Sequence, residues 1–220
     1  MPEKGTALMV SRESFETEAL IYSEHNGTPG WHKPSECVWS DTTHIHGKIA
    51  VNAEYGDLKV LFVERLQVPL LDLNMVFDQL LEATTLSLPV SAIKELLKTL
   101  NSFLRSEPSP PSSRRLLYCR IFPVREPSTS NVTLCSSNTQ FTLVDRAGPP
   151  SRFKDMVRVL DFTLQEIHQL KPLLAWLRLD SRYLSRCMKE TSLLGDGLYA
   201  RISQPYRDLR KKAYALLRYI

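Results

Sequence analysis

Several features that mark membrane proteins and secreted domains are missing from this sequence of 220 residues. No stretch of eighteen consecutive apolar residues occurs, so we expect no membrane-spanning helix. Residues 1–6 are not a basic segment followed by an apolar run, and they do not have the pattern of a secretory signal. We therefore expect an intracellular protein, cytoplasmic or nuclear, that does not associate with a membrane.

Cysteine is scarce. The chain has four cysteines, and none belongs to a C-x-x-C pair: Cys37, Cys119, Cys135 and Cys187. Scattered, unpaired cysteines are typical of reduced thiols in an intracellular protein, and they offer no disulfide framework.

Motifs for catalysis and for cofactor binding are also missing. The sequence contains neither the G-x-S-x-G elbow of serine hydrolases nor the G-x-x-x-x-G-K-[ST] loop that cradles phosphates. Residues 195–197, Gly-Asp-Gly, lack the third glycine and the following helix of a dinucleotide-binding loop, and we interpret them as a hairpin turn. We therefore predict that the protein is not an enzyme and binds no cofactor.

What is present is the composition of a folded globular protein, with 43% apolar and 24% charged residues. We predict an α+β fold of two lobes. Residues 1–105 are expected to form a mainly helical lobe that begins with an extended segment, and residues 116–220 an α+β lobe whose small, mostly antiparallel sheet is packed by helices. Residues 106–115, rich in proline and serine, are the predicted mobile linker between them.

The best-defined local signal lies between residues 157 and 190. Residues 157–162 have the pattern of a buried strand, and Thr163 then begins a helix through a capping box with Glu166. Pro172 lacks an N–H and clashes with the preceding turn, so we expect it to kink this helix or to begin a second one. A further helical stretch is expected over residues 180–189.

Three amphipathic helices are expected between residues 51 and 105. Asp72 and Ser91 are the predicted N-caps of the second and the third. In the first helix, the apolar residues are expected to share one stripe: Tyr55, Leu58, Leu61, Phe62 and Leu66. In the third helix, four polar residues are expected to face water: Lys94, Glu95, Lys98 and Asn101.

The second lobe is expected to open with strands. Residues 116–124 are apolar on both faces except at Arg120, as in a central strand. Residues 132–135 and 140–145 supply two more candidate strands. The last helix is expected to begin near Pro205, since proline is favoured in a first helical turn.

Potential metal ligands cluster within one segment of the first lobe: His25, His32, Cys37, His44 and His46. A His-x-His spacing puts both imidazoles on one side of an extended strand, which could hold zinc. Four residues are candidate ligands: His32, Cys37, His44 and His46. Their intervals do not match the paired spacing of structural zinc sites, so we favour the interpretation that they are polar loop residues.

Positive charge concentrates towards the end of the chain. Residues 1–150 contain 14 basic and 17 acidic residues (−3), whereas residues 151–220 contain 14 and 7 (+7). Five basic residues of the last helix form a candidate interaction surface: Arg207, Arg210, Lys211, Lys212 and Arg218. Such a strip contacts phosphates in nucleic-acid-binding proteins, although the solvated face of an amphipathic helix has the same pattern.

A series of short motifs resembles, in order and spacing, a segment of large uncharacterised fungal proteins. Those proteins are similar to the sacsin and NO VEIN group, which carries an Hsp90-type (GHKL) ATPase domain near the N-terminus. The motifs lie at residues 31–40, 121–124, 134–137, 141–146, 160–166, 183–186 and 211–218.

The resemblance implies a downstream, non-catalytic region, because nothing in this chain matches the D-x-G-x-G motif of those ATPases. We therefore predict a non-enzymatic protein-interaction or scaffold module, related to chaperone-like proteins, with an unidentified protein partner. A nucleic-acid-binding module that uses the basic last helix is the alternative hypothesis. A zinc-binding protein that uses the histidine and cysteine cluster is the second alternative.

Overall fold

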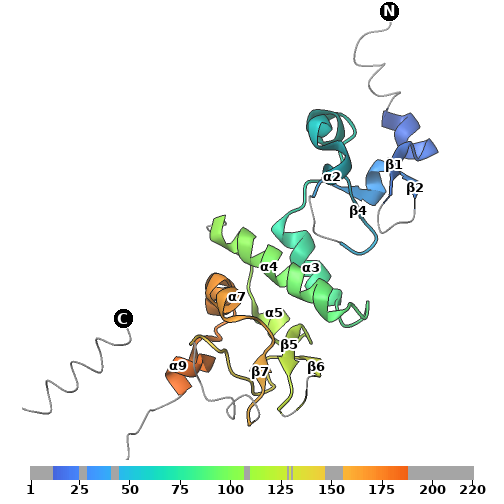
Figure 1. Cartoon of the computed structure of the whole chain (residues 1–220). Coiled ribbons are helices and arrows are strands. Elements are labelled where there is room, and N and C mark those ends of the chain that lie inside the picture. The colour runs from blue at the N-terminus through green and yellow to red at the C-terminus, as the bar shows by residue number, and fades with distance from the viewer. Residues whose placement is uncertain are drawn as a thin grey trace, which may run out of the picture. The chain divides into compact units, whose positions relative to one another are not determined.

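The computed structural model describes residues 12–24, 29–40, 45–106, 110–127, 129, 131–146 and 156–187 (Figure 1). The chain divides into two compact units, residues 1–187 and 188–220, and every described residue lies in the first. The predicted turn at 195–197 and the predicted helix from Pro205 therefore lie outside the described residues.

The part of the chain up to residue 70 combines short strands with single helical turns, and residues 12–18 are helical. Two pairs of strands form here: β1 with β2 antiparallel, and β3 with β4 parallel. This part is therefore richer in strands than the mainly helical lobe that the sequence predicted. Its labelled elements are β1 (Ile21–Ser23), β2 (Gly30–His32), η2 (Pro34–Glu36), β3 (Cys37–Val38), β4 (Ile49–Ala50), α2 (Asn52–Tyr55), η3 (Gly56–Leu58) and η4 (Val60–Arg65).

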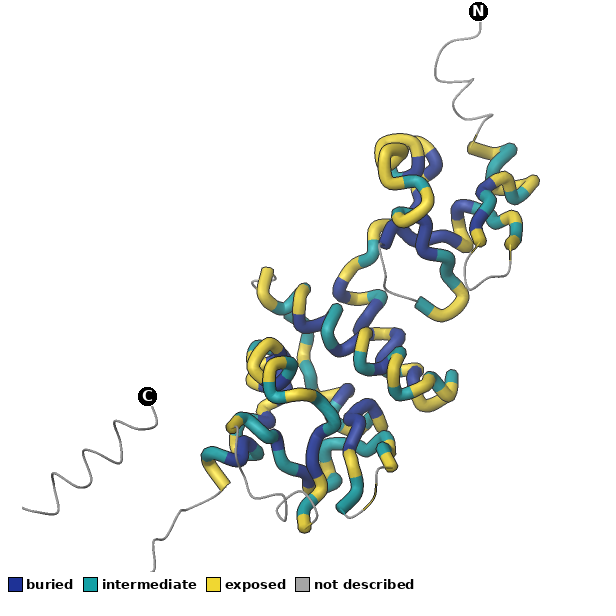
Figure 2. Tube along the Cα trace, in the orientation of Figure 1, coloured by how far each residue is buried: buried dark blue, intermediate teal, exposed yellow. Residues whose placement is uncertain are grey.

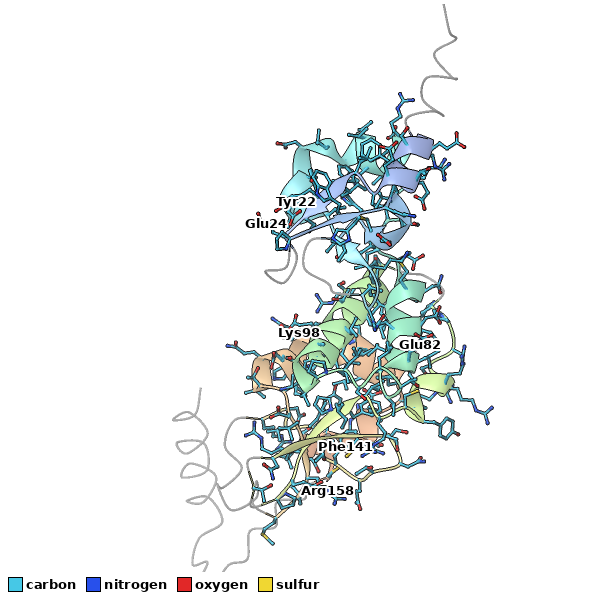
Figure 3. The ribbon with its side chains drawn as sticks, turned by 90° about the vertical axis from the view of Figure 1, so that its right-hand side faces the viewer. Tyr22, Glu24, Glu82, Lys98, Phe141 and Arg158 are labelled. Atoms are coloured by element: carbon cyan, nitrogen blue, oxygen red, sulfur yellow. The ribbon has the colours of Figure 1, made fainter. Side chains whose placement is uncertain are left out.

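A small core holds these elements together. Trp39, only 7% exposed, packs on Phe62 with the ring centroids 5.7 Å apart. Trp31, in contrast, is 63% exposed and pairs with Tyr22 across the β1–β2 pair. Tyr22 in turn lies near Glu24 (Figure 3). Trp39 therefore belongs to this core, whereas Trp31 lies at the surface. The buried members of this core are Ile21, Cys37, Trp39, Val51, Phe62, Leu66 and Val68.

From residue 72 onwards, helices pack on a three-stranded antiparallel sheet with the order β6-β5-β7. Together with the strands of the first part, this gives the α+β fold class that the sequence predicted. The elements are α3 (Leu73–Glu82), α4 (Val90–Ser106), α5 (Arg114–Leu117), β5 (Phe122–Arg125), β6 (Val132–Cys135), β7 (Val159–Leu160), α7 (Leu164–Gln169), α8 (Lys171–Trp176), η5 (Asp180–Arg182) and α9 (Leu184–Cys187).

The predicted strand at 116–124 begins six residues later than expected, because the helical turn α5 takes up its first part. A short apolar run fits either element, since Leu116 is fully buried in a helical turn as it would be in a strand. The predicted strand at 140–145 is reduced to isolated bridges. Thr142 pairs with Val159 and Leu143 with Tyr183, both parallel, so this segment lies between β7 and the start of α9.

One large core spans both sides of the predicted linker. Residues of α3 and α4 share a buried cluster with residues of β5, α7 and α8, and α4 shows a continuous buried side (Figure 2). Residues 110–113 dock on α8, because the Trp176 indole N–H donates to the Pro111 carbonyl at 3.0 Å and the Ser113 hydroxyl donates to the Trp176 carbonyl at 3.0 Å. The core therefore does not follow a division into lobes at 106–115.

Within the described part of the chain, four helix starts were predicted from a capping residue or a proline, and three of them are confirmed. The Asp72 side chain accepts from the Met75 amide at 2.8 Å, and Thr163 and Glu166 form the predicted capping box. Pro172 lies in the first turn of the new helix α8. Ser91 is not an N-cap, since α4 already begins at Val90. Among the described residues, no helix combines the length and the apolar character needed to cross a bilayer.

Candidate functional site

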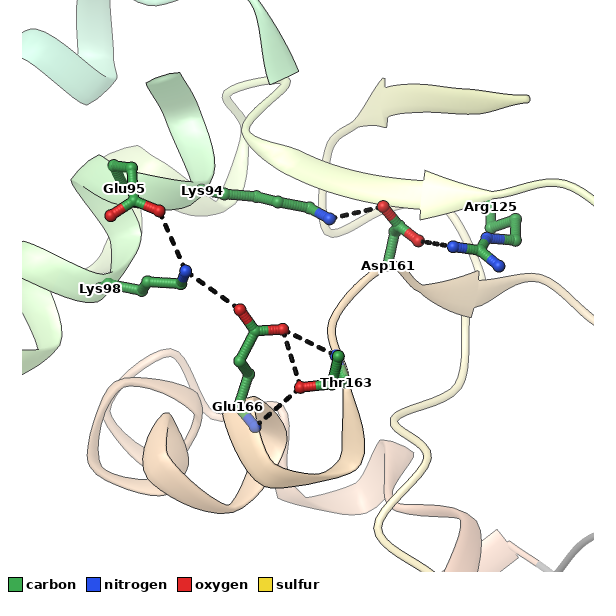
Figure 4. Close-up of polar contacts among 7 residues, drawn as sticks. All are labelled: Lys94, Glu95, Lys98, Arg125, Asp161, Thr163 and Glu166. Atoms are coloured by element: carbon green, nitrogen blue, oxygen red, sulfur yellow. Dashed lines mark hydrogen bonds and ion pairs between the residues drawn. The ribbon is translucent and has the colours of Figure 1, made fainter. Parts of the chain in front are cut away.

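Paired charges join α4 to the sheet and to α7 (Figure 4). At their centre is Asp161, which follows β7 and has a side chain only 12% exposed. One of its carboxylate oxygens accepts from Lys94 Nζ at 2.5 Å, and the other accepts from the Arg125 guanidinium at the end of β5. The ammonium group of Lys94 also lies 5.2 Å from the centroid of the Phe162 ring. Asp161 thus ties a helix and a strand together.

A second carboxylate, that of Glu166, lies in the first turn of α7. One of its oxygens is 3.0 Å from Lys98 Nζ of α4, and the same ammonium donates to Glu95 at 2.9 Å. The other oxygen accepts from the Thr163 amide at 2.8 Å and from the Thr163 hydroxyl at 2.9 Å. The capping box that begins α7 is therefore also the point at which α7 is held against α4.

The electrostatics of both carboxyl groups favour their charged forms. Burial acts to raise the pKa of Asp161, but the hydrogen bonds from Lys94 and Arg125 outweigh it and hold that pKa below its usual value. Burial likewise opposes ionisation of Glu166, and hydrogen bonds from Thr163 and Lys98 lower its pKa. A general acid at neutral pH needs a raised pKa, so this arrangement suits structural pairing better than proton transfer.

Asn101 occupies the break between α7 and α8. In an uninterrupted helix, the Leu173 amide would donate to the Gln169 carbonyl four residues back. Here the Leu173 amide donates to Asn101 Oδ1 at 3.1 Å, and Asn101 Nδ2 donates to the Gln169 carbonyl at 3.1 Å. A side-chain amide from α4 therefore replaces one rung of the helix that Pro172 interrupts. The prediction that Asn101 faces water is wrong, because it is only 5% exposed.

A small pocket of about 220 Å³ lies beside this break and the Glu166 pair. Its volume is below the roughly 300 Å³ at which ligand sites for small molecules usually begin. Two of its polar side chains already have protein partners, since Arg105 donates to the Gln169 carbonyl at 2.8 Å and Lys98 binds Glu166. The lining residues are Lys98, Asn101, Ser102, Arg105, Glu166, Gln169 and Leu170.

The candidate zinc ligands are not assembled in the described part of the chain, where no three residues of the ligand types come together. His32 lies near Glu36, with 3.9 Å between Nδ1 and the carboxylate, and His46 contributes its backbone amide to Gln79 Oε1 at 3.1 Å. Cys37 is fully buried in the smaller core. His25 and His44 lie outside the described residues.

The environment of Cys37 also disfavours a reactive thiol. Burial, with a smaller contribution from the neighbouring Glu36 carboxylate, raises its pKa to about 12. The thiol therefore stays protonated at neutral pH, whereas nucleophiles and metal ligands are thiolates. The predicted interaction residues of the last helix lie outside the described residues: Arg207, Arg210, Lys211, Lys212 and Arg218.

An exposed apolar surface, which the sequence did not predict, lies on residues 58–61. Leu58 is 45% exposed, Val60 60% and Leu61 40%. The predicted stripe fails here because the segment does not form a regular α-helix. It passes from the 3₁₀ turn η3 into the π-helical turn η4, where the Leu66 amide donates to the Leu61 carbonyl five residues back. This winding buries Phe62 and leaves Leu58, Val60 and Leu61 exposed to solvent.

A comparison with known protein families identifies the family of this chain. A family model described as "Domain of unknown function (DUF8348)" matches residues 74–188, just over half of the 220 residues. The protein belongs to the DUF8348 family. Comparisons with curated proteins and with solved structures gave no match.

The DUF8348 match coincides with a physical unit. The buried residues of the large core run from Leu73 to Tyr183, so the family region, residues 74–188, begins and ends within about five residues of it. The charge pairs around Asp161 and the Asn101 bridge both lie inside the DUF8348 region, where they fix α4 against α7 and α8. The apolar surface at residues 58–61 lies outside it. Residues before 74 therefore carry a surface that is separate from the shared family core.

Proposed function

We propose that this protein is a non-enzymatic interaction module that binds a protein partner through the apolar surface of Leu58, Val60 and Leu61. The observation that carries the proposal is the exposure of three large aliphatic side chains within four residues, immediately before the buried Phe62. Contiguous exposed apolar residues mark interaction sites more often than isolated ones do.

The described polar groups support a binding role over catalysis. Asp161 and Glu166 form ion pairs within the protein, and these pairs lower the pKa values of both carboxyl groups. An active site needs groups left free to act on a substrate, with pKa values matched to that task. The resemblance to the region downstream of an Hsp90-type ATPase agrees with a module that brings a partner to a larger chaperone-like assembly.

We place this activity inside the cell. All four cysteines are free: Cys37, Cys119, Cys135 and Cys187. Free thiols suit a reducing compartment, since secreted proteins of this kind usually pair their cysteines.

The test compares partner capture by four forms of the purified, tagged full chain. Wild type is compared with Val60→Ser and Leu61→Ser, and with Glu64→Ser as a matched control, because Glu64 is exposed on the same segment. Proteins recovered from a lysate after brief crosslinking are quantified by mass spectrometry. Burying one aliphatic side chain contributes about 1.5–3 kcal/mol, so each serine variant should lose a specific partner by roughly tenfold or more.

Glu64→Ser should retain the partner at the wild-type amount. The proposal is wrong if the serine variants, shown to be folded by their unchanged thermal transition, recover the same proteins in the same amounts as wild type. It is also wrong if wild type recovers nothing above the tag alone.

A further inference from the structure

A second exposed surface lies inside the DUF8348 region, on the helical turn α5. Leu116 is fully buried there, so the opposite side of the turn faces outwards. Tyr118 keeps a helical backbone conformation, and its amide donates to the Arg115 carbonyl at 3.4 Å. Residues three and four apart share one face of a helical turn, so the Tyr118 ring lies on the side that carries Arg114 and Arg115. We call Arg114, Arg115, Tyr118 and the flanking Arg120 the arginine–tyrosine surface.

All four of these side chains are exposed, and Tyr118 is 63% exposed. At this exposure, the Tyr118 side chain neither belongs to the core nor packs over it. Its ring offers a flat apolar face on the side of the turn that carries two arginines, and an aromatic ring with arginines is the combination that recognises a base together with its phosphates.

The positive charge of this surface is not neutralised by the described part of the protein. Elsewhere in the DUF8348 region, cations meet carboxylates: Lys94 and Arg125 bind Asp161, and Arg158 binds Glu126. No ion pair forms between Arg114, Arg115 or Arg120 and any described carboxylate, although α3, which packs against α5, carries Asp78 and Glu82. The Nε of Arg120 donates to the Leu134 carbonyl at 3.1 Å.

The surface is held in place by contacts on three sides. The Ser113 hydroxyl before it bonds to the Trp176 carbonyl of α8, and the Ser137 amide donates to the Leu117 carbonyl at 2.9 Å. The Arg120 bond to the β6 carbonyl fixes the other end. The arginines and the tyrosine therefore project from an anchored turn, which lowers the entropy cost of ordering them around a ligand.

We propose that the arginine–tyrosine surface binds single-stranded nucleic acid, with one base stacked on Tyr118 and the flanking phosphates paired with Arg114 and Arg115. The exposed ring decides against an acidic peptide, because carboxylates pair with arginines alone and gain nothing from a stacking platform. The short extent of one helical turn fits one or two nucleotides of a flexible strand better than a rigid duplex. This activity is separate from the proposed protein-binding surface and uses none of its residues.

The experiment measures binding of a fluorescein-labelled, mixed-sequence 12-nucleotide RNA to the full chain by anisotropy at two salt concentrations. Wild type is compared with Arg114→Gln/Arg115→Gln, Tyr118→Ala and Tyr118→Phe. The matched control is Lys171→Gln/Arg186→Gln, which removes the same charge from exposed positions on α8 and α9. A further variant, Arg207→Gln/Lys211→Gln/Arg218→Gln, tests the basic strip that the sequence predicted.

We expect Tyr118→Ala to weaken binding by about 5- to 150-fold, the effect of losing one base–aromatic stack, and Tyr118→Phe to restore it. Arg114→Gln/Arg115→Gln should weaken binding and lower the slope of log affinity against log salt by about 1.4, that is, about 0.7 for each lost phosphate contact. The matched control should stay close to wild type.

Three results overturn the proposal. The first is no saturable RNA binding by the folded wild type. The second is binding that falls equally in the matched control, or only in the variant of the last helix, since the surface then contributes no more than diffuse charge or nothing at all. The third is an acidic glutamate-rich peptide that competes with the RNA while Tyr118→Ala has no effect, because the ligand class would then be an acidic protein segment.

Discussion

Replacing Asn101 by alanine should destabilise the DUF8348 core more than its size suggests. The substitution leaves the Leu173 amide, which Pro172 and the helix break have already deprived of its normal partner, without an acceptor. An unsatisfied buried amide costs about 1–3 kcal/mol. Loss of the bond from Nδ2 to the Gln169 carbonyl costs less, about 0.5–1.5 kcal/mol, because that carbonyl keeps Arg105 as a donor.

The expected decrease in the free energy of unfolding is therefore about 1.5–4.5 kcal/mol, the sum of the two losses. It is measured by urea unfolding of the full chain, followed by far-UV circular dichroism, with the midpoint and the slope fitted separately. A second variant, Asn101→Asp, keeps an acceptor for the Leu173 amide but loses the donor to Gln169. It also buries a charge, so it should not rescue the loss.

Asn74→Ala provides the matched control, because Asn74 is an exposed helical residue of α3. Removing an exposed asparagine from a helix should change stability by no more than about 0.5 kcal/mol. If Asn101→Ala unfolds within that same margin of wild type, the bridge across the α7–α8 break does not contribute to stability and the reasoning fails.

Two further changes test the polar and buried groups of the same core. Asp161→Asn should lower the free energy of unfolding at pH 7 by about 1–3 kcal/mol, between the values of exposed and buried ion pairs. The pKa of Asp161 is lowered in the folded state, so this contribution is complete above the carboxyl pKa of the unfolded chain, about 4, and is lost as the pH falls through the lower folded value. Urea titrations of both proteins from pH 7 to pH 3 should therefore converge, and a constant difference would contradict the pairing. Tyr183→Phe should be neutral or stabilising by up to about 1 kcal/mol, because the buried hydroxyl has no partner among the described residues. A loss above 1 kcal/mol in the same assay would mean that the hydroxyl has a partner.

Local signals in the sequence were sufficient where a few adjacent residues decide the structure. Asp72 and Thr163 each begin a helix through their own side chains, and Pro172 begins α8 because it cannot continue α7. The prediction that Ser91 is an N-cap is wrong. An N-cap residue has a non-helical backbone, and here the helix has already begun at Val90.

The candidate site was less predictable, although some of its signals were present. Asn101 follows Leu97 by four residues and precedes Leu104 by three, so helical spacing already placed it on the apolar face of α4. The pairing of Lys94 with Asp161 carries no such signal, because the two residues are far apart in the sequence and nothing local links them. The exposure of Leu58 and Leu61 follows from the passage of the chain from a 3₁₀ turn into a π-helical turn. The local signal against a regular α-helix is Gly56, a poor helix former.

The sequence by itself determined the α+β class, the main helix starts and the apolar faces of α3 and α4, because these depend on residue spacing and on caps within one turn. Only the tertiary structure decided that α3 and α4 share a core with the sheet across residues 106–115. The same holds for which polar groups are buried, and for the arginines of α5, which form no ion pair with a described carboxylate. These outcomes depend on which distant segments come into contact. The free energy of such contacts is set by packing and by desolvation, which cannot be deduced from any single stretch of the chain.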